Sequence, residues 1–164
     1  MTRVFKLFLL FLLATIGHWF FAAILGRWGI SVNLMLIFAI ASCTVLPRAW
    51  GYPVAFVSGL FLDFFSTKLF GANAFTFTCC SCAVYGLARR LDFDGFIPQM
   101  AVVFLGSVFA AFLNSWLIWI FSSSILWAGI LNILSGAVIG AISAPFVFKV
   151  IHKILRDGAE AGPQ

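Results

Sequence analysis

The residues of this chain best suited to chemistry are an acid and a base, Asp63 and Lys68, in a stretch that is otherwise almost entirely apolar, "LDFFSTKLFGANAF". A single carboxylate within a membrane can serve a proton-coupled carrier. His18 could instead act as the base for a nucleophilic Ser107 or Ser115, as in an intramembrane serine protease. The sequence contains no Gly-rich phosphate loop, zinc-protease helix, nucleophile elbow or spaced carboxylate pair. We therefore expect no enzyme and no catalytic residue.

The cysteines do not predict a metal site. None of the four has the paired spacing with an accompanying His that marks zinc ligands. All lie in apolar runs, where a thiol serves as a small apolar side chain. We expect neither metal nor cofactor at these positions, which are Cys43, Cys79, Cys80 and Cys82.

The composition is that of an integral membrane protein. Of the 164 residues, 63% are hydrophobic and 9% are charged, whereas soluble domains are about 25% charged. The formal net charge of +5 does not indicate nucleic-acid binding, because the basic residues sit between apolar runs. There they set orientation and contact anionic lipid head groups.

Charges and turn-forming residues divide the chain into about six apolar segments. A membrane-crossing helix needs about 20 mainly apolar residues. We predict an all-α protein in which residues 1–164 form a single polytopic membrane domain, one bundle of about six transmembrane helices. The expected spans are 5–25, 30–46, 51–65, 70–88, 97–121 and 125–148.

The distribution of basic residues predicts the orientation. Cytoplasmic loops carry an excess of Lys and Arg, and an even number of spans puts both termini on one side. With both termini cytoplasmic, only Arg27 and Lys68 face outward. We expect the first span to stay as an anchor; cleavage as a signal peptide is the alternative. The inward-facing basic residues are Arg3, Lys6, Arg48, Arg89, Arg90, Lys149, Lys153 and Arg156.

The polar residues within the spans concentrate in their outer halves on this topology. Two interpretations stay open. They could form separate hydrogen bonds between neighbouring helices, each worth about 1 kcal/mol or less. Alternatively, they could line one outward-facing pocket that receives a partner helix or a ligand head group. The residues are His18, Asn33, Asp63, Asn73, Asn114 and Asn132.

Asp63 is expected near the C-terminus of its helix, where the helix dipole disfavours an anion. It therefore needs a partner. Gly71 suits a tight turn into the next helix, and Asn73 could cap that helix. A charged hairpin tip anchored at the interface is an equal alternative. The candidate partners of Asp63 are Lys68, His18, Ser66, Thr67 and the backbone amides that start the fourth helix.

Small residues mark surfaces for close helix packing. Gly136 and Gly140 form a G-x-x-x-G in the sixth span, and Gly106 with Ala110 forms a similar pair in the fifth. The pattern leaves open whether the neighbouring helix belongs to this chain or to another protein.

Residues 31–90 resemble the MreD family of bacterial rod-shape-determining membrane proteins. That family shows an Asn or Asp at the start of the second span, a Gly-rich third span and a D-L-x-S-G-x-x-x-G-x-x-A signature. This chain departs from the family pattern at Val32, in place of proline, and at Thr67, in place of the first glycine. The matching residues are Asn33, Gly59, Asp63, Ser66, Gly71 and Ala74.

The resemblance implies a non-enzymatic scaffold in the plasma (inner) membrane of a bacterium, required for rod cell shape. Such a scaffold would bind the bitopic partner MreC and link it to peptidoglycan synthases. Its indirect partners would be the MreB filament, the RodA glycosyltransferase and a penicillin-binding transpeptidase.

An alternative function is the substrate-binding membrane subunit of an energy-coupling-factor vitamin transporter, which has a similar size and span count. Such subunits usually carry A-x-x-x-A in the first span and have outer loops that close over the vitamin. Here only Ala22 and Gly26 have that spacing, and the expected outer loops are short.

Overall fold

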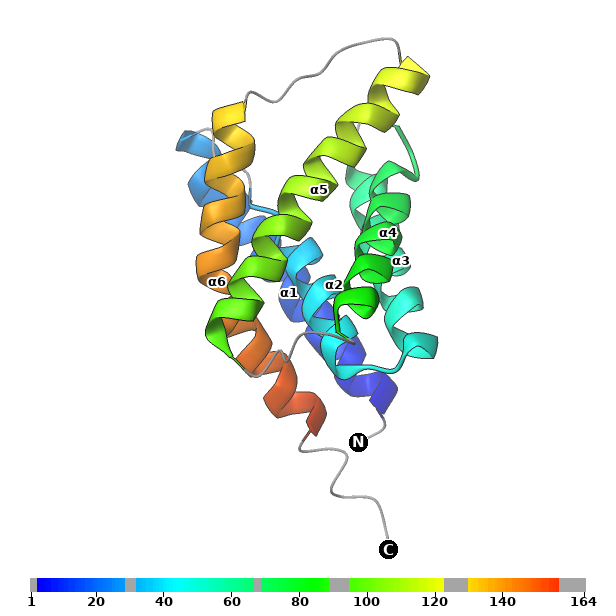
Figure 1. The fold of residues 1–164 in the computed structure, drawn as a ribbon, viewed down its shortest axis with the longest axis vertical. Helices are drawn as coiled ribbons and strands as arrows, with labels where there is room; N and C mark the ends of the chain where they lie inside the picture. Colours follow the sequence, from blue (N-terminus) through cyan, green and yellow to red (C-terminus); the bar gives the residue numbers. More distant parts are fainter. Residues whose placement is uncertain (1–2, 29–31, 67–68, 89–94, 123–129, 157–164) are drawn as a thin grey trace, which may run out of the picture.

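The computed structural model describes residues 3–28, 32–66, 69–88, 95–122 and 130–156. This part of the chain is all-helical, as the sequence predicts (Figure 1). The helices are α1 (Arg3–Leu25), η1 (Gly26–Trp28, a 3-10 turn), α2 (Leu34–Val45), α3 (Arg48–Phe65), α4 (Ala72–Leu87), α5 (Phe96–Ser122) and α6 (Ile130–Arg156).

In the described part of the chain, three helices are long and apolar enough to cross a membrane: Val4–Leu25 of α1, Phe96–Phe121 of α5 and Leu131–Leu155 of α6. The other three are shorter. With 12 residues, α2 extends about 18 Å, against a hydrocarbon thickness of about 30 Å. The second span was expected to begin at residue 30, whereas α2 begins at Leu34, directly after its cap Asn33. Residues 30 and 31 lie outside the described residues.

The last helix extends past the end of the expected membrane span of 125–148. It continues to Arg156, since "KVIHKILR" keeps helix-forming residues without a break. Residues 125–129 of that expected span lie outside the described residues.

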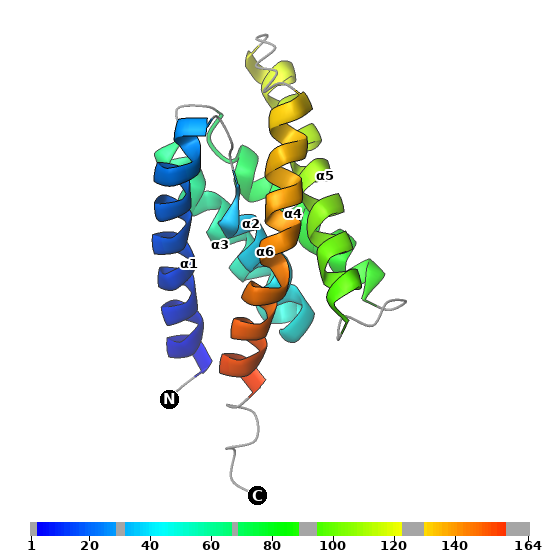
Figure 2. The same ribbon diagram turned by 90° about the vertical axis from the view of Figure 1, so that its left-hand side faces the viewer.

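The helices form a bundle around α2. The start of α1 and the end of α6 lie at one end, here called the proximal end (Figures 1 and 2). The end of α3 and the start of α4 lie at the opposite, distal end (Figure 1). Helices α5 and α6 separate toward the distal end (Figure 1).

Helix α2 forms the centre of the core. Its residues from Leu34 to Cys43 are all buried, and Met35 and Ala41 have no exposed surface. A helix that is apolar on every side is stable only when surrounded. Helices α1, α3, α4, α5 and α6 all contact it.

Polar contacts join the helices at the proximal end. The Tyr85 hydroxyl donates to the carbonyl of Leu46, 3.0 Å away, and the Arg48 guanidinium lies 5.8 Å from the centre of the Tyr85 ring. The Lys6 ammonium donates to the carbonyl of Ile154 at 3.2 Å, which ties α1 to α6. Hydrogen bonds therefore join the helices of this apolar bundle at its proximal end.

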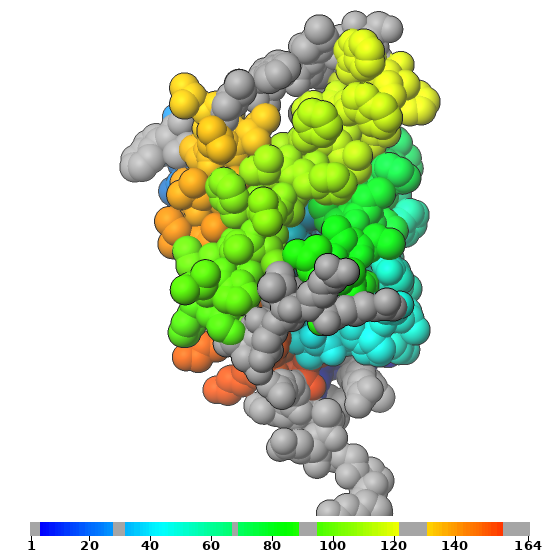
Figure 3. All heavy atoms as spheres, viewed as in Figure 1, coloured from blue at the N-terminus to red at the C-terminus, as the bar shows by residue number. Residues whose placement is uncertain are grey.

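The outer surface is strongly apolar. Large side chains such as Phe112, Leu131 and Phe146 are at least 70% exposed. Figure 3 shows the face on which α5 crosses the bundle between α4 and α6. Such a surface suits hydrocarbon rather than water, which agrees with the composition.

Candidate functional site

The carboxylate of Asp63 is the centre of a buried polar site. Asp63 is 1% exposed, so it does not sit on an exposed hairpin tip. Its Oδ1 accepts hydrogen bonds from the backbone N–H of Asn73 at 3.1 Å and from Asn73 Nδ2 at 2.9 Å. Its Oδ2 accepts from the backbone N–H of Ala74 at 3.0 Å. All three donors belong to the first turn of α4.

Asp63 therefore caps α4 from the neighbouring helix. The second and third residues of a helix have no intrahelical acceptor for their N–H groups, and Asn73 and Ala74 hold these positions in α4. The N-cap residue, Gly71, has φ 91° and no side chain to cap them. The positive end of the α4 dipole also compensates the anion, which its own helix end disfavours.

This geometry selects among the expected partners of Asp63. The backbone amides at the start of the fourth helix were one candidate, and they bind the carboxylate. The expectation that Asn73 caps α4 is wrong: its amide donates to Asp63. Ser66 is the C-cap residue of α3. Lys68 and Thr67 lie outside the described residues.

Gly59 allows the carboxylate to reach α4. A Cβ atom at Gly59 would lie 2.5 Å from the Cα of Ala74 and 2.5 Å from the carbonyl oxygen of Asn73. Because both are backbone atoms, no side-chain rotation could relieve the overlap. Gly59 is one helical turn before Asp63, on the same face, so the two residues set the crossing of α3 and α4 together.

Asn73 extends the site to a third helix. Its Oδ1 accepts a hydrogen bond of 2.6 Å from Asn114 Nδ2 of α5. The side chains of Asp63, Asn73 and Asn114 thus form a chain across α3, α4 and α5. In the apolar interior each member satisfies polar groups of the next.

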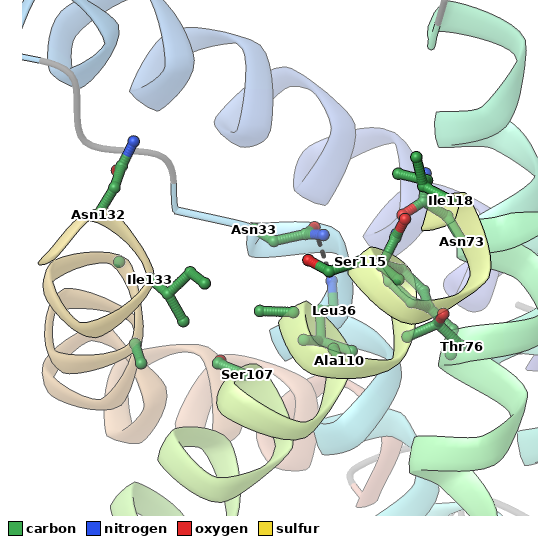
Figure 4. A pocket seen from close by; sticks show the side chains of 15 residues that line it. Asn33, Leu36, Asn73, Thr76, Ser107, Ala110, Ser115, Ile118, Asn132 and Ile133 are labelled. Atoms are coloured by element: carbon green, nitrogen blue, oxygen red, sulfur yellow. Dashed lines mark hydrogen bonds between the residues drawn. The ribbon is translucent and has the colours of Figure 1, made fainter. Parts of the chain in front are cut away.

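A cavity of about 250 Å³ adjoins this chain, between α2, α4, α5 and α6. Four of the asparagines singled out in the sequence line it: Asn33, Asn73, Asn114 and Asn132. Figure 4 shows the side chains of the four helices around it. Asn33 also caps α2, since its Oδ1 accepts from the N–H of Leu36 at 3.2 Å.

His18 lies on a second cavity, of about 380 Å³, that has Asn33 and Asn73 in its wall as well. Its Nδ1 is buried without a hydrogen-bond partner among the described residues. Because Asn33 and Asn73 line both cavities, His18 lies at the same level of the bundle as the asparagines. Ser107 and Ser115 line the first cavity, whereas His18 lines the second.

The small residues of α5 and α6 pack within the chain. A Cβ at Gly106 would lie 2.7 Å from Ile40 of α2, and a Cβ at Gly140 would lie 3.5 Å from Ile37 and 3.8 Å from Ser107. Gly136 is buried on the cavity wall. The glycines thus bring α5 and α6 against α2.

The cysteines are free thiols. Cys43 and Cys80 are buried, whereas Cys82 is exposed. Within the described ranges, no cluster of three His, Cys, Asp or Glu side chains could hold a metal ion.

The structure adds residues that the sequence analysis missed. Gly51 and Ala55 are buried on α3, and a side chain at Gly51 would overlap the hydroxyl of Tyr85. With Gly59 and Asp63 they recur every four residues, a spacing that puts them on one face. This repeat of small residues that ends in an acid was the signal in the sequence that could have revealed them.

Comparison of the chain with known protein families, characterised proteins and solved structures found no match.

Proposed function

We propose that this chain is a multi-pass scaffold of the bacterial inner membrane, part of the machinery that elongates the cell wall. In this function it binds an MreC-like bitopic protein and links it to peptidoglycan synthases. The proposal rests on the resemblance of residues 31–90 to the MreD family and on the roles of the matching residues in the fold.

The observation that carries the proposal is what the signature residues do. Asp63 caps α4 and Gly59 fits against Ala74. Gly71 supplies the left-handed turn, and Asn33 caps α2. The first two residues hold α3 against α4, and the last two shape the starts of α4 and α2. A signature devoted to packing supports a scaffold, because a carrier or enzyme needs its polar groups available to a substrate.

The position of charge supports the proposed orientation. Lys6, Arg48, Lys149 and Lys153 belong to the start of α1, the start of α3 and the last turns of α6, all at the proximal end (Figure 1). A cytoplasmic proximal end satisfies the positive-inside rule. The long apolar surfaces of α1, α5 and α6 then face lipid or the transmembrane helix of a partner.

Purification of the tagged chain from its native membrane in mild detergent tests this function. We expect an MreC-like bitopic protein and cell-wall synthases to be recovered with it. A tagged polytopic protein of similar size from the same membrane is the control. Recovery of a pair of ATPase subunits without cell-wall proteins would contradict the scaffold and support the vitamin-transporter alternative.

A further inference from the structure

The described residues leave a cavity unfilled between α2, α4, α5 and α6. On α5 the lining residues recur at helical spacing along one face and are mostly small. They are Ser107, Ala110, Ala111, Asn114, Ser115 and Ile118. Other faces of α5 carry large side chains such as Phe109 and Phe112. The space is therefore built by the choice of small residues on one face.

The walls offer uncharged hydrogen-bonding groups. Three hydroxyls, of Thr76, Ser107 and Ser115, and four asparagine amides line the cavity, and none of the described lining residues is charged. Hydroxyl and amide side chains both donate and accept hydrogen bonds. They therefore complement a ligand whose own groups both donate and accept hydrogen bonds, as the hydroxyl groups of an alcohol do.

The hydroxyl of Thr76 indicates a hydrogen-bond partner that the described residues do not supply. Thr76 is fully buried, and its Oγ1 has no hydrogen-bond partner among the described residues. Two other hydroxyls of α4 bond to a carbonyl one turn earlier: Thr78 to Ala74 at 2.8 Å and Ser81 to Phe77 at 2.8 Å. Since buried polar groups are nearly always paired, Thr76 marks this wall as incomplete.

We propose that this cavity binds one small uncharged polyol group, either a free polyol or the hydroxyl-bearing head group of a lipid. The volume of about 250 Å³ is sufficient for a single sugar ring, since an engineered cavity of about 150 Å³ already admits benzene. Ser115 is exposed and lines the cavity, which leaves a way in. The proposal does not rest on the scaffold function, although Asn33, one of the residues that match the MreD signature, lines the cavity.

The test measures the thermal unfolding midpoint of the full chain in phosphatidylcholine nanodiscs, because a ligand that binds the folded state raises it. The probes are free glucose, free glycerol and monoglucosyl diacylglycerol, with diacylglycerol as the lipid control. A saturable rise with the free probes assigns the site to a soluble polyol. A rise with the glucosyl lipid alone assigns it to a lipid head group.

Variants locate the binding. Ala111→Leu fills the cavity and is expected to abolish the rise, whereas Ala101→Leu, at an exposed position of α5, is expected to preserve it. Thr76→Val combined with Ser115→Ala is expected to weaken binding by about tenfold through lost hydrogen bonds while leaving the ligand-free midpoint unchanged or higher. No rise with any probe, or an equal rise in Ala111→Leu, would overturn the proposal.

Discussion

Replacement of Asp63 by alanine is expected to lower the free energy of unfolding by on the order of 3 kcal/mol. The carboxylate accepts three hydrogen bonds from Asn73 and Ala74. Its removal leaves two backbone amides and one side-chain amide in a buried site without their acceptor. Denaturant titration of the purified chain in mixed micelles measures the change.

Two further variants separate charge from hydrogen bonding in this prediction. Asp63→Asn has nearly the same shape but only one acceptor oxygen, so we expect an intermediate loss. Asn114→Ala removes the single bond of 2.6 Å to Asn73 and is expected to cost about 1 kcal/mol. Equal stability of all three variants and the wild type would contradict the account of Asp63 as the cap of α4.

Replacement of Gly59 by alanine is expected to destabilise the fold by about 3 kcal/mol through overpacking. The added methyl group would meet backbone atoms of Asn73 and Ala74 at 2.5 to 2.7 Å, so α3 and α4 must move apart. That movement also lengthens the bonds from Asp63 to α4. The same titration in mixed micelles measures the loss.

Gly86 provides the matched control for Gly59. It also lies in a helix, α4, but nothing lies within 4 Å of a Cβ built there. Alanine has the higher helix propensity, so Gly86→Ala is expected to raise stability by up to about 1 kcal/mol. If Gly59→Ala were equally stabilising, the close approach of α3 and α4 would be disproved.

The sequence predicted the helical class from composition and spacing. It did not predict the geometry of Asp63, because a cap supplied by another helix depends on how α3 and α4 cross. The order of the chain suggested Asn73 as a local cap, but Gly71 takes the N-cap position and Asn73 bonds to Asp63 instead.

The apolar pattern of the sequence also did not predict the short length of α2. Residues 30–46 are apolar enough for a longer helix, but Asn33 offers the N–H of Leu36 an acceptor and fixes the start there. Thr76 was missed for a related reason. A threonine in a helix usually bonds to its own backbone, and only the structure reveals that this one does not.

Hydrogen exchange at the start of α4 tests the central claim, that Asp63 organises the distal end by capping α4. In the wild-type chain we expect the amides of Asn73 and Ala74 to exchange slowly, since the carboxylate accepts both. In Asp63→Asn at least one of them should exchange much faster, while amides in the middle of α5 keep their protection. Fast exchange of both amides in the wild type, or unchanged protection in the variant, would contradict the claim.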